Sequence, residues 1–189
     1  MHPSIVSALA AGAPPMLAAM LAQLGLHEVE GKGSNPAIMQ MARRVAGSHP
    51  KLDWVGGFYE DDDIPWCGLA VADAACRAGL TPVLPNPLSA RAWADWGSPL
   101  VGPRRGALVV FSRQGGGHVG LVAAVTSGAK RLLVAGGNQS NAITLAWFDN
   151  IPTVSGGRVL GFRAPPSSGA LPEAPVVADD GRPVSRSEA

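Results

Sequence analysis

The stretch that decides the fold is residues 107–137, which read ALVVFSRQGGGHVGLVAAVTSGAKRLLVAGG. Runs rich in Val, Leu and Phe alternate here with Gly and Ser clusters, a pattern that predicts β-strands joined by turns. Together with the sequence that follows, it predicts strands at 107–112, 118–125, 131–135, 143–148 and 159–163. Connections this short favour an antiparallel meander.

Helices are predicted ahead of this stretch, at 15–24, 35–46, 66–78 and 89–96. Asn35 and Ser89 are of the type that caps helix N-termini, and Gly79 and Gly97 follow two of the predicted C-termini. Helices that precede an antiparallel sheet indicate the α+β class, with N-terminal helices packed on a five- to six-stranded sheet.

The chain divides into three predicted regions: a helical extension at 1–27, a folded domain at 28–164 and a tail at 165–189. The tail is rich in Pro, Ser, Ala and charge, so it is predicted to be disordered. The apolar N-terminus has no Lys or Arg ahead of it and is interrupted by Gly12, Pro14 and Pro15, which argues against a membrane span and a clear signal peptide.

Bulk composition limits the function classes. The chain has 189 residues, and its 47% hydrophobic content is enough for a sizeable core. A formal net charge of +1 provides no broad basic field, so nucleic acid is not an expected partner.

The two cysteines, Cys67 and Cys76, both fall on the helix predicted at 66–78. Nine residues of helix rise about 13.5 Å and turn the two thiols to opposite faces, so no disulfide is predicted. The chain has no CxxC or Cys/His cluster, and neither a metal site nor a cofactor is predicted.

Cys67 lies at the start of that helix, directly after Pro65 and Trp66. Unpaired N–H groups and the positive end of the helix dipole stabilise a thiolate there, so Cys67 is a candidate nucleophile. The alternative is a small buried hydrophobe, which is how Cys76 is interpreted because it continues an apolar stripe.

His118 follows the turn Gly115–Gly117 and is predicted to share a strand face with Gly120, Val122 and Ala124. Small side chains on that face would let the helix of Cys67 pack closely, which makes His118 a candidate base. A solvated turn histidine is the alternative.

Asn138, or else Gln139, is a candidate to accept the imidazole N–H and orient the ring, although GGNQSN also suits a simple turn.

Taken in order, IPWCG (64–68), VVFSRQGGGHVG (109–120) and VAGGNQSN (134–141) resemble the motifs of the NlpC-type cysteine peptidases and related CHAP amidases. The resemblance is closest to a phage-associated branch and extends over residues 28–164, including EVEGKGSNPAI (28–38) and PNPLSARAWADWG (85–97). Two positions depart from the pattern: many relatives have Asp at the position of Ala107, and CHAP relatives often have Glu at that of Gly136.

The resemblance implies a papain-like catalytic domain that hydrolyses amide bonds of peptidoglycan stem peptides, as an endopeptidase or amidase. Cys67 is then the nucleophile, His118 the base and Asn138 the orienting residue, with Gln139 as the alternative. Other residues receive weaker roles: Tyr59 is a candidate oxyanion donor or a packing residue, and Trp66 and Gly117 are candidates for substrate binding.

The same resemblance implies a monomer whose partner is bacterial peptidoglycan, with no stable membrane insertion. Such a protein is made in the cytoplasm and reaches the periplasm or cell wall through a phage or a secretion apparatus. The acidic run 60–63 is expected to be solvated and to bind a cationic stem-peptide amine rather than calcium, whose loops alternate ligands around a Gly turn. Trp54, Trp93 and Trp96 are predicted as groove or core residues.

Two other function classes remain open on the sequence. One is a deamidase or acyltransferase that acts on proteins with the same Cys/His pair. The other is a non-catalytic wall-binding or phage structural module.

Overall fold

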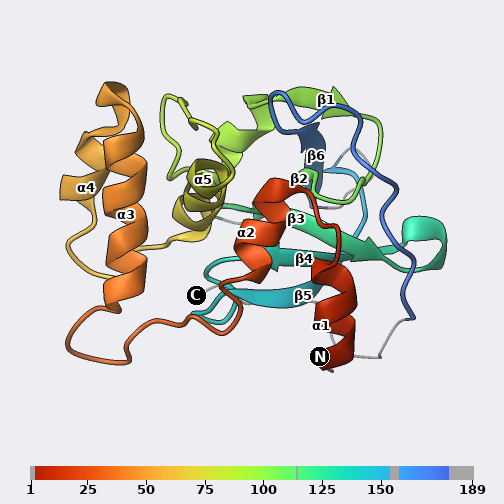
Figure 1. The fold of residues 1–189 in the computed structure, drawn as a ribbon, viewed down its shortest axis with the longest axis horizontal. Helices are drawn as coiled ribbons and strands as arrows, with labels where there is room; N and C mark the ends of the chain where they lie inside the picture. The colour runs from red at the N-terminus through yellow and green to blue at the C-terminus, as the bar shows by residue number, and fades with distance from the viewer. Residues whose placement is uncertain (1–2, 114, 154–157, 179–189) are drawn as a thin grey trace.

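A computed structural model describes residues 3–113, 115–153 and 158–178 (Figure 1). The helices are α1 (Pro3–Ala10), α2 (Pro15–Leu21), α3 (Pro36–Ser48), α4 (Trp54–Phe58) and α5 (Cys67–Arg77), with 3-10 turns η1 (Pro50–Leu52), η2 (Ala90–Asp95) and η3 (Ser127–Ala129). The strands are β1 (Ser98–Leu100), β2 (Leu108–Arg113), β3 (Gly116–Val125), β4 (Arg131–Gly136), β5 (Thr144–Asp149) and β6 (Val159–Ala164).

The predicted α+β class is confirmed, because helices lead into one six-stranded antiparallel sheet of order β1-β6-β2-β3-β4-β5. Each predicted strand is present within about two residues of its expected position. The sequence analysis did not predict β1, α1 and α4; β1 and α4, with three and five residues, are too short for a clear periodicity.

The helix predictions hold with small changes in their bounds. The Asn35 side chain accepts a hydrogen bond from the Ala37 N–H at 2.9 Å, so the predicted cap of α3 is confirmed. The segment predicted as a helix at 89–96 is a 3-10 turn, and Ser89 makes no capping hydrogen bond with its side chain.

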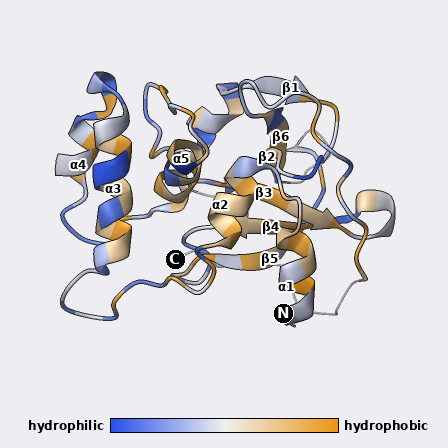
Figure 2. Cartoon of the chain, viewed as in Figure 1, coloured by the Kyte–Doolittle hydropathy of each residue, from blue (hydrophilic) through white to orange (hydrophobic). Residues whose placement is uncertain are grey.

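The sheet separates two hydrophobic clusters. The helix-side core packs α2, α3 and α5 against Val119, Leu121 and other residues on one face of the sheet. The far-side core lies on the opposite face and includes Phe111, Val122 and Phe148. In Figures 1 and 2, α2 and α5 lie over the sheet, and hydrophobic residues dominate α2 and the central strands.

A buried carboxylate joins the helices to one another. Asp73 on α5 is fully buried and accepts hydrogen bonds from Arg44 of α3 at 2.7 Å, from Arg77 at 2.6 Å and from Gln23 after α2 at 3.2 Å. Paired in this way, the buried charge is compensated, and it links three helices at one point.

Both ends of the described chain belong to this fold. Leu17 and Met20 of α2, in the predicted extension 1–27, lie in the helix-side core together with α5. The prediction of a disordered tail does not hold for residues 172–177: the Arg105 and Val125 N–H groups donate to the Pro172 and Pro175 carbonyls, and the Val177 N–H donates to the Val125 carbonyl. The rest of that tail, from residue 179, lies outside the described residues. No described helix has the length and apolar character needed to cross a membrane.

Candidate functional site

Cys67 is the first residue of α5, as the sequence predicts. The helix start is seated closely against the chain that leads into η2, since a side chain at Gly68 would lie 2.7 Å from the Pro87 carbonyl oxygen. Neither Cys67 nor Cys76 forms a disulfide, and Cys67 is only 7% exposed. The N-terminal position favours a thiolate, whereas the burial limits access of a substrate.

Tyr59 lies close enough to Cys67 for the two to interact electrostatically. Burial, and to a smaller extent the charge of Cys67, raises the pKa of Tyr59 well above its usual value. Its hydroxyl donates to the Pro65 carbonyl at 2.8 Å, and this uses its only proton. The predicted oxyanion role is therefore not supported, and Tyr59 acts as a packing residue of the loop before α5.

The imidazole of His118 is completely buried on β3. It stacks between Phe111 and Phe148, with ring centroids 6.1 and 5.4 Å away. Burial is the main cause that lowers the pKa of His118 to about 3; the charges of Arg113 and Arg158 act in the same direction, and the hydrogen bond with Gln139 opposes them. The ring is therefore neutral at pH 7, in the state of a base that has not yet taken a proton.

Gln139, and not the favoured Asn138, is positioned to orient the ring. The Gln139 Oε1 lies 3.3 Å from the His118 Nε2. The other end of the amide, Nε2, donates to the Thr144 and Gly136 carbonyls at 2.7 and 3.2 Å, which settles the orientation of the amide. Oε1 therefore accepts the imidazole N–H, and the proton of the neutral ring is on Nε2.

The chain leaves strand β4 at Gly136, in agreement with the alternative interpretation of GGNQSN as a turn. Asn138, Ser140 and Asn141 all have left-handed φ values, between 54° and 57°. Residues 138–141 thus form a turn, and strand geometry no longer decides where their side chains point. Asn138 is buried, with 3% of its surface exposed.

The strand face of His118 also differs from the prediction. His118 pairs with Phe111 in the β2–β3 register, so both side chains project into the far-side core. The face turned toward α5 carries Val119 and Leu121 instead. Gly120 and Val122 share the face of His118 as predicted, whereas Ala124 lies in the helix-side core because the register shifts between Val122 and Ala124. The face of His118 is not the one that α5 covers.

Gly136 and Gly137 are the contact between the imidazole and the helix of Cys67. A side chain at Gly136 would lie 3.3 Å from the His118 Nε2, whereas one at Gly137 would lie 2.8 Å from the Trp66 ring. The two glycines are thus in contact with the imidazole on one side and with the residue before Cys67 on the other. At this point the backbone of Gly136 and Gly137 lies between the imidazole and the Trp66 ring.

The thiol–imidazole hydrogen bond is not formed in this structure. The Nδ1 of His118 is buried, and no described residue makes a hydrogen bond to it. Because Nε2 carries the proton, Nδ1 is the nitrogen whose lone pair is available. The structure therefore brings His118 and Gln139 together and leaves Nδ1 without an engaged proton donor.

Of the predicted substrate-binding residues, Trp66 is fully buried, and its Nε1–H donates to the Glu28 carboxylate. It therefore supports the helix start and does not face solvent. Gly117 is half-buried and packs against Arg91 of η2. Trp93 and Trp96 are buried core residues. Trp54 is 41% exposed, so it is the accessible one of the three tryptophans predicted as groove or core residues.

An acidic cavity of about 700 Å³ adjoins the site. It is lined by His27, Glu28, Val29, Glu30, Gly31, Asp63, Ser140 and Asn141. Burial, and after it the charges of the aspartates at 61–63, raises the pKa of Glu28, while its hydrogen bond to Trp66 acts in the opposite direction. Ser140 and Asn141 directly follow Gln139 in the chain, and Glu28 accepts the Trp66 Nε1–H, so the cavity lining is connected to residues next to both parts of the proposed site.

The prediction that the acidic run 60–63 is solvated is wrong for Asp62. Asp62 is fully buried, and its Oδ2 accepts the N–H groups of Val29 and Asn35 at 3.0 and 2.7 Å. One carboxylate oxygen from each of Asp61, Asp62 and Asp63 lies within 4.8 Å of the others, a spacing that suits a cation. The central aspartate thereby anchors the loop that forms the wall of the acidic cavity.

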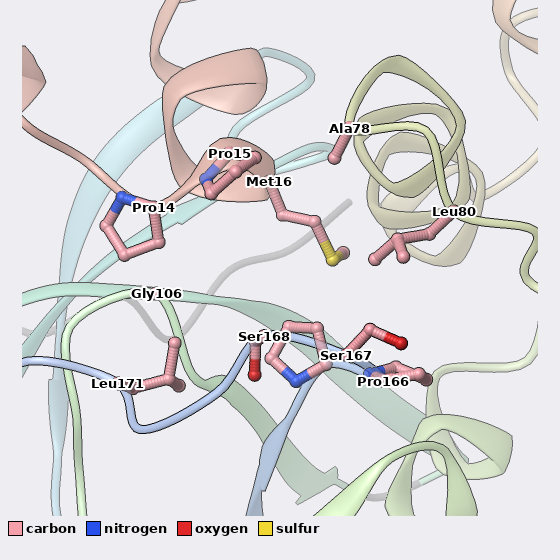
Figure 3. Close-up of a pocket in the computed structure, with 11 residues that line it drawn as sticks. Pro14, Pro15, Met16, Ala78, Leu80, Gly106, Pro166, Ser167, Ser168 and Leu171 are labelled. Atoms are coloured by element: carbon pink, nitrogen blue, oxygen red, sulfur yellow. The ribbon is translucent and has the colours of Figure 1, made fainter.

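A second cavity, of about 110 Å³, is apolar and separate from these residues. Figure 3 shows Met16 of α2, Leu80 after α5 and Leu171 of the C-terminal segment around it. Its lining carries no acid, base or thiol, so we assign no chemistry to it.

Comparison of the chain with family models, curated proteins and solved structures finds no match.

Proposed function

We propose that this protein is a cysteine-dependent amide hydrolase with a papain-like arrangement of helix and sheet, and that it cleaves peptidoglycan stem peptides. Cys67 is the nucleophile, His118 the general base and Gln139 the orienting residue. This assignment rests on the resemblance of the three ordered motifs to NlpC-type and CHAP enzymes. Gln139 takes the role for which Asn138 is favoured on sequence.

One structural observation supports this function best. The Gln139 oxygen accepts the Nε2–H of His118, so the proton-free Nδ1 is kept as the basic atom of the ring. A base needs this tautomer to take a proton from a thiol through Nδ1. The dipeptide Gly136–Gly137 contacts that ring on one side and Trp66 and Ala70, which flank Cys67 in the chain, on the other.

The reaction begins with an opening of the site, since His118 is fully buried and Cys67 is 7% exposed. The Cys67 thiol then gives its proton to Nδ1, and the sulfur attacks the amide carbonyl. The imidazolium returns the proton to the leaving amine, and the neutral ring activates water to release the acid from the thioester. The backbone N–H of Cys67 is the proposed oxyanion donor.

The acidic cavity supports a substrate with a free amine. Glu28, Glu30 and Asp63 contribute three carboxylates to its lining, and no Lys or Arg is among the lining residues. Stem peptides carry such amines, so we propose bacterial peptidoglycan as the partner. Delivery to the periplasm or cell wall by a phage or a secretion apparatus follows from that substrate.

The burial of His118 favours a second candidate function, that of a non-catalytic wall-binding or phage structural module. An imidazole with no exposed surface and no hydrogen bond to a thiol is what a purely structural histidine also shows. In that case the acidic cavity binds peptide, and Cys67 performs no chemistry.

Digestion of purified peptidoglycan separates these candidates. We expect Cys67→Ala to lower the release of new amine termini by at least about a thousandfold, as loss of a nucleophile does in hydrolases. Cys76→Ser is the matched control and is expected to retain activity, and EDTA is expected to have no effect. Mass spectrometry of the products identifies the bond that is cut.

Full wall-degrading activity in a folded Cys67→Ala variant would exclude the hydrolase mechanism. Cleavage of no wall peptide by the wild type, with intact binding, would favour the structural module. Release of ammonia from a protein substrate, without new termini from the wall, would indicate the deamidase alternative.

A further inference from the structure

The segment 87–91 contacts both halves of the proposed site. At one end, a side chain on Gly68, the neighbour of Cys67, would lie 2.7 Å from the Pro87 carbonyl oxygen. At the other end, a side chain on Gly117, the neighbour of His118, would lie 3.1 Å from the Cγ of Arg91. Both neighbours are glycines, so this segment packs directly on backbone next to each proposed catalytic residue.

Arg91 is the charged residue of this segment. It is exposed, and its Nε–H donates to the Gly116 carbonyl at 3.0 Å, two residues before His118. This bond anchors the guanidinium at the start of β3 and does not use the two terminal NH₂ groups. No carboxylate of the described residues pairs with Arg91. The two terminal NH₂ groups of the Arg91 guanidinium are therefore available to donate hydrogen bonds to an acceptor on a ligand.

The surrounding charges favour an acidic ligand on this side. Arg113 and Arg158 also act on His118 as positive charges. The carboxylates of the acidic cavity belong to other elements, at 28–30 and 63. A guanidinium binds a carboxylate through two parallel hydrogen bonds, and this match is better than that with any neutral group.

We propose that Arg91 binds a free carboxylate on the substrate residue next to the scissile amide, and that it selects acidic peptides over their amidated forms. This inference rests on the proposed function, because it uses the same site. It adds a specificity-determining residue from η2, outside the three motifs that carry the nucleophile, the base and the orienting amide.

Two synthetic peptides, identical except for a carboxylate or a carboxamide beside the scissile bond, test the proposal. The wild type is expected to prefer the carboxylate in kcat/KM by about 10- to 100-fold, the range of charge-assisted hydrogen bonds. Arg91→Gln is expected to abolish this preference through KM, with kcat nearly unchanged. Arg91→Lys is expected to restore part of it.

Arg43→Gln, at an exposed arginine of α3, is the control and is expected to keep the full preference. A preference that survives in Arg91→Gln would overturn the assignment. Failure of the wild type to cleave either peptide would count against the hydrolase alone. In that event, calorimetric binding of both peptides decides on Arg91, and equal affinities in the wild type would refute its role.

Discussion

At the residue scale, His118 combines a strong burial cost with a single orienting hydrogen bond. A ring with no exposed surface cannot be hydrated when charged, so it stays neutral in the folded protein. The bond to Gln139 then decides which nitrogen holds the proton. For the proposed role as a general base, the pKa of His118 has to rise toward neutrality, and a negative charge brought close to the ring by a substrate would raise it.

The first prediction concerns the stability of the folded protein at low pH. The pKa of His118 falls from 6.5 to about 3 on folding, so protonation favours the unfolded state. The contribution of the neutral His118 ring to the free energy of unfolding is complete above pH 6.5. It is lost as the pH falls from 6.5 toward 3, by up to about 5 kcal/mol. Urea unfolding of the wild type across this range measures the loss.

His118→Phe is the matched variant, because a phenyl ring fits between Phe111 and Phe148 and does not titrate. The difference in unfolding free energy between the two proteins is expected to change in this pH window. A constant difference from pH 7 to pH 4 would show that the imidazole is not buried as a neutral ring.

At the element scale, α5 packs against the end of β4. Gly136 leaves space for the imidazole and the Gln139 amide, and Gly137 leaves space for Ala70 and the Trp66 ring. Neither residue has the positive φ that makes glycine necessary for conformational reasons. Close approach of side chains from both faces of the strand is therefore the reason for two glycines here.

The second prediction tests that close approach. Gly137→Ala would place a methyl group against Ala70 and 2.8 Å from the Trp66 ring, so we expect a loss of about 1–3 kcal/mol in unfolding free energy. Gly47→Ala in α3 meets nothing within 4 Å and is expected to be neutral or to stabilise by about 0.5–1 kcal/mol. Denaturant titration measures both. Equal stabilities would mean that α5 is not seated on this strand end.

At the scale of the whole molecule, both terminal regions complete the core. α2 covers the sheet beside α5, and the segment after β6 returns along the molecule to pair with Val125. An ion pair between Arg104 and Glu173 accompanies this segment. The fold therefore extends beyond the predicted domain limits 28 and 164 at both ends.

The third prediction tests the docking of the C-terminal segment with two adjacent valines. Val177 packs against the helix-side core, whereas Val176 is 67% exposed. Val177→Asp is expected to lower the unfolding free energy by about 2 kcal/mol, and Val176→Asp to change it by less than about 0.5 kcal/mol. Thermal unfolding distinguishes them. Identical melting temperatures would show that this segment does not stabilise the folded protein.

The sequence by itself determined the elements with strong local signals. The β-rich runs after residue 107, the Asn35 cap and the position of Cys67 at a helix start all follow from patterns a few residues long. Such features depend on neighbours in the chain, and local propensity and capping are sufficient to predict them.

Only the tertiary structure decided which groups meet. The choice of Gln139 over Asn138 depends on the left-handed turn at 138–141 and on the carbonyls of Gly136 and Thr144 around its amide. The face of His118 depends on its register with Phe111, and the docking of the tail depends on Val125, fifty residues away. These contacts join distant parts of the chain, so their energies appear only when the sheet and helices have packed together.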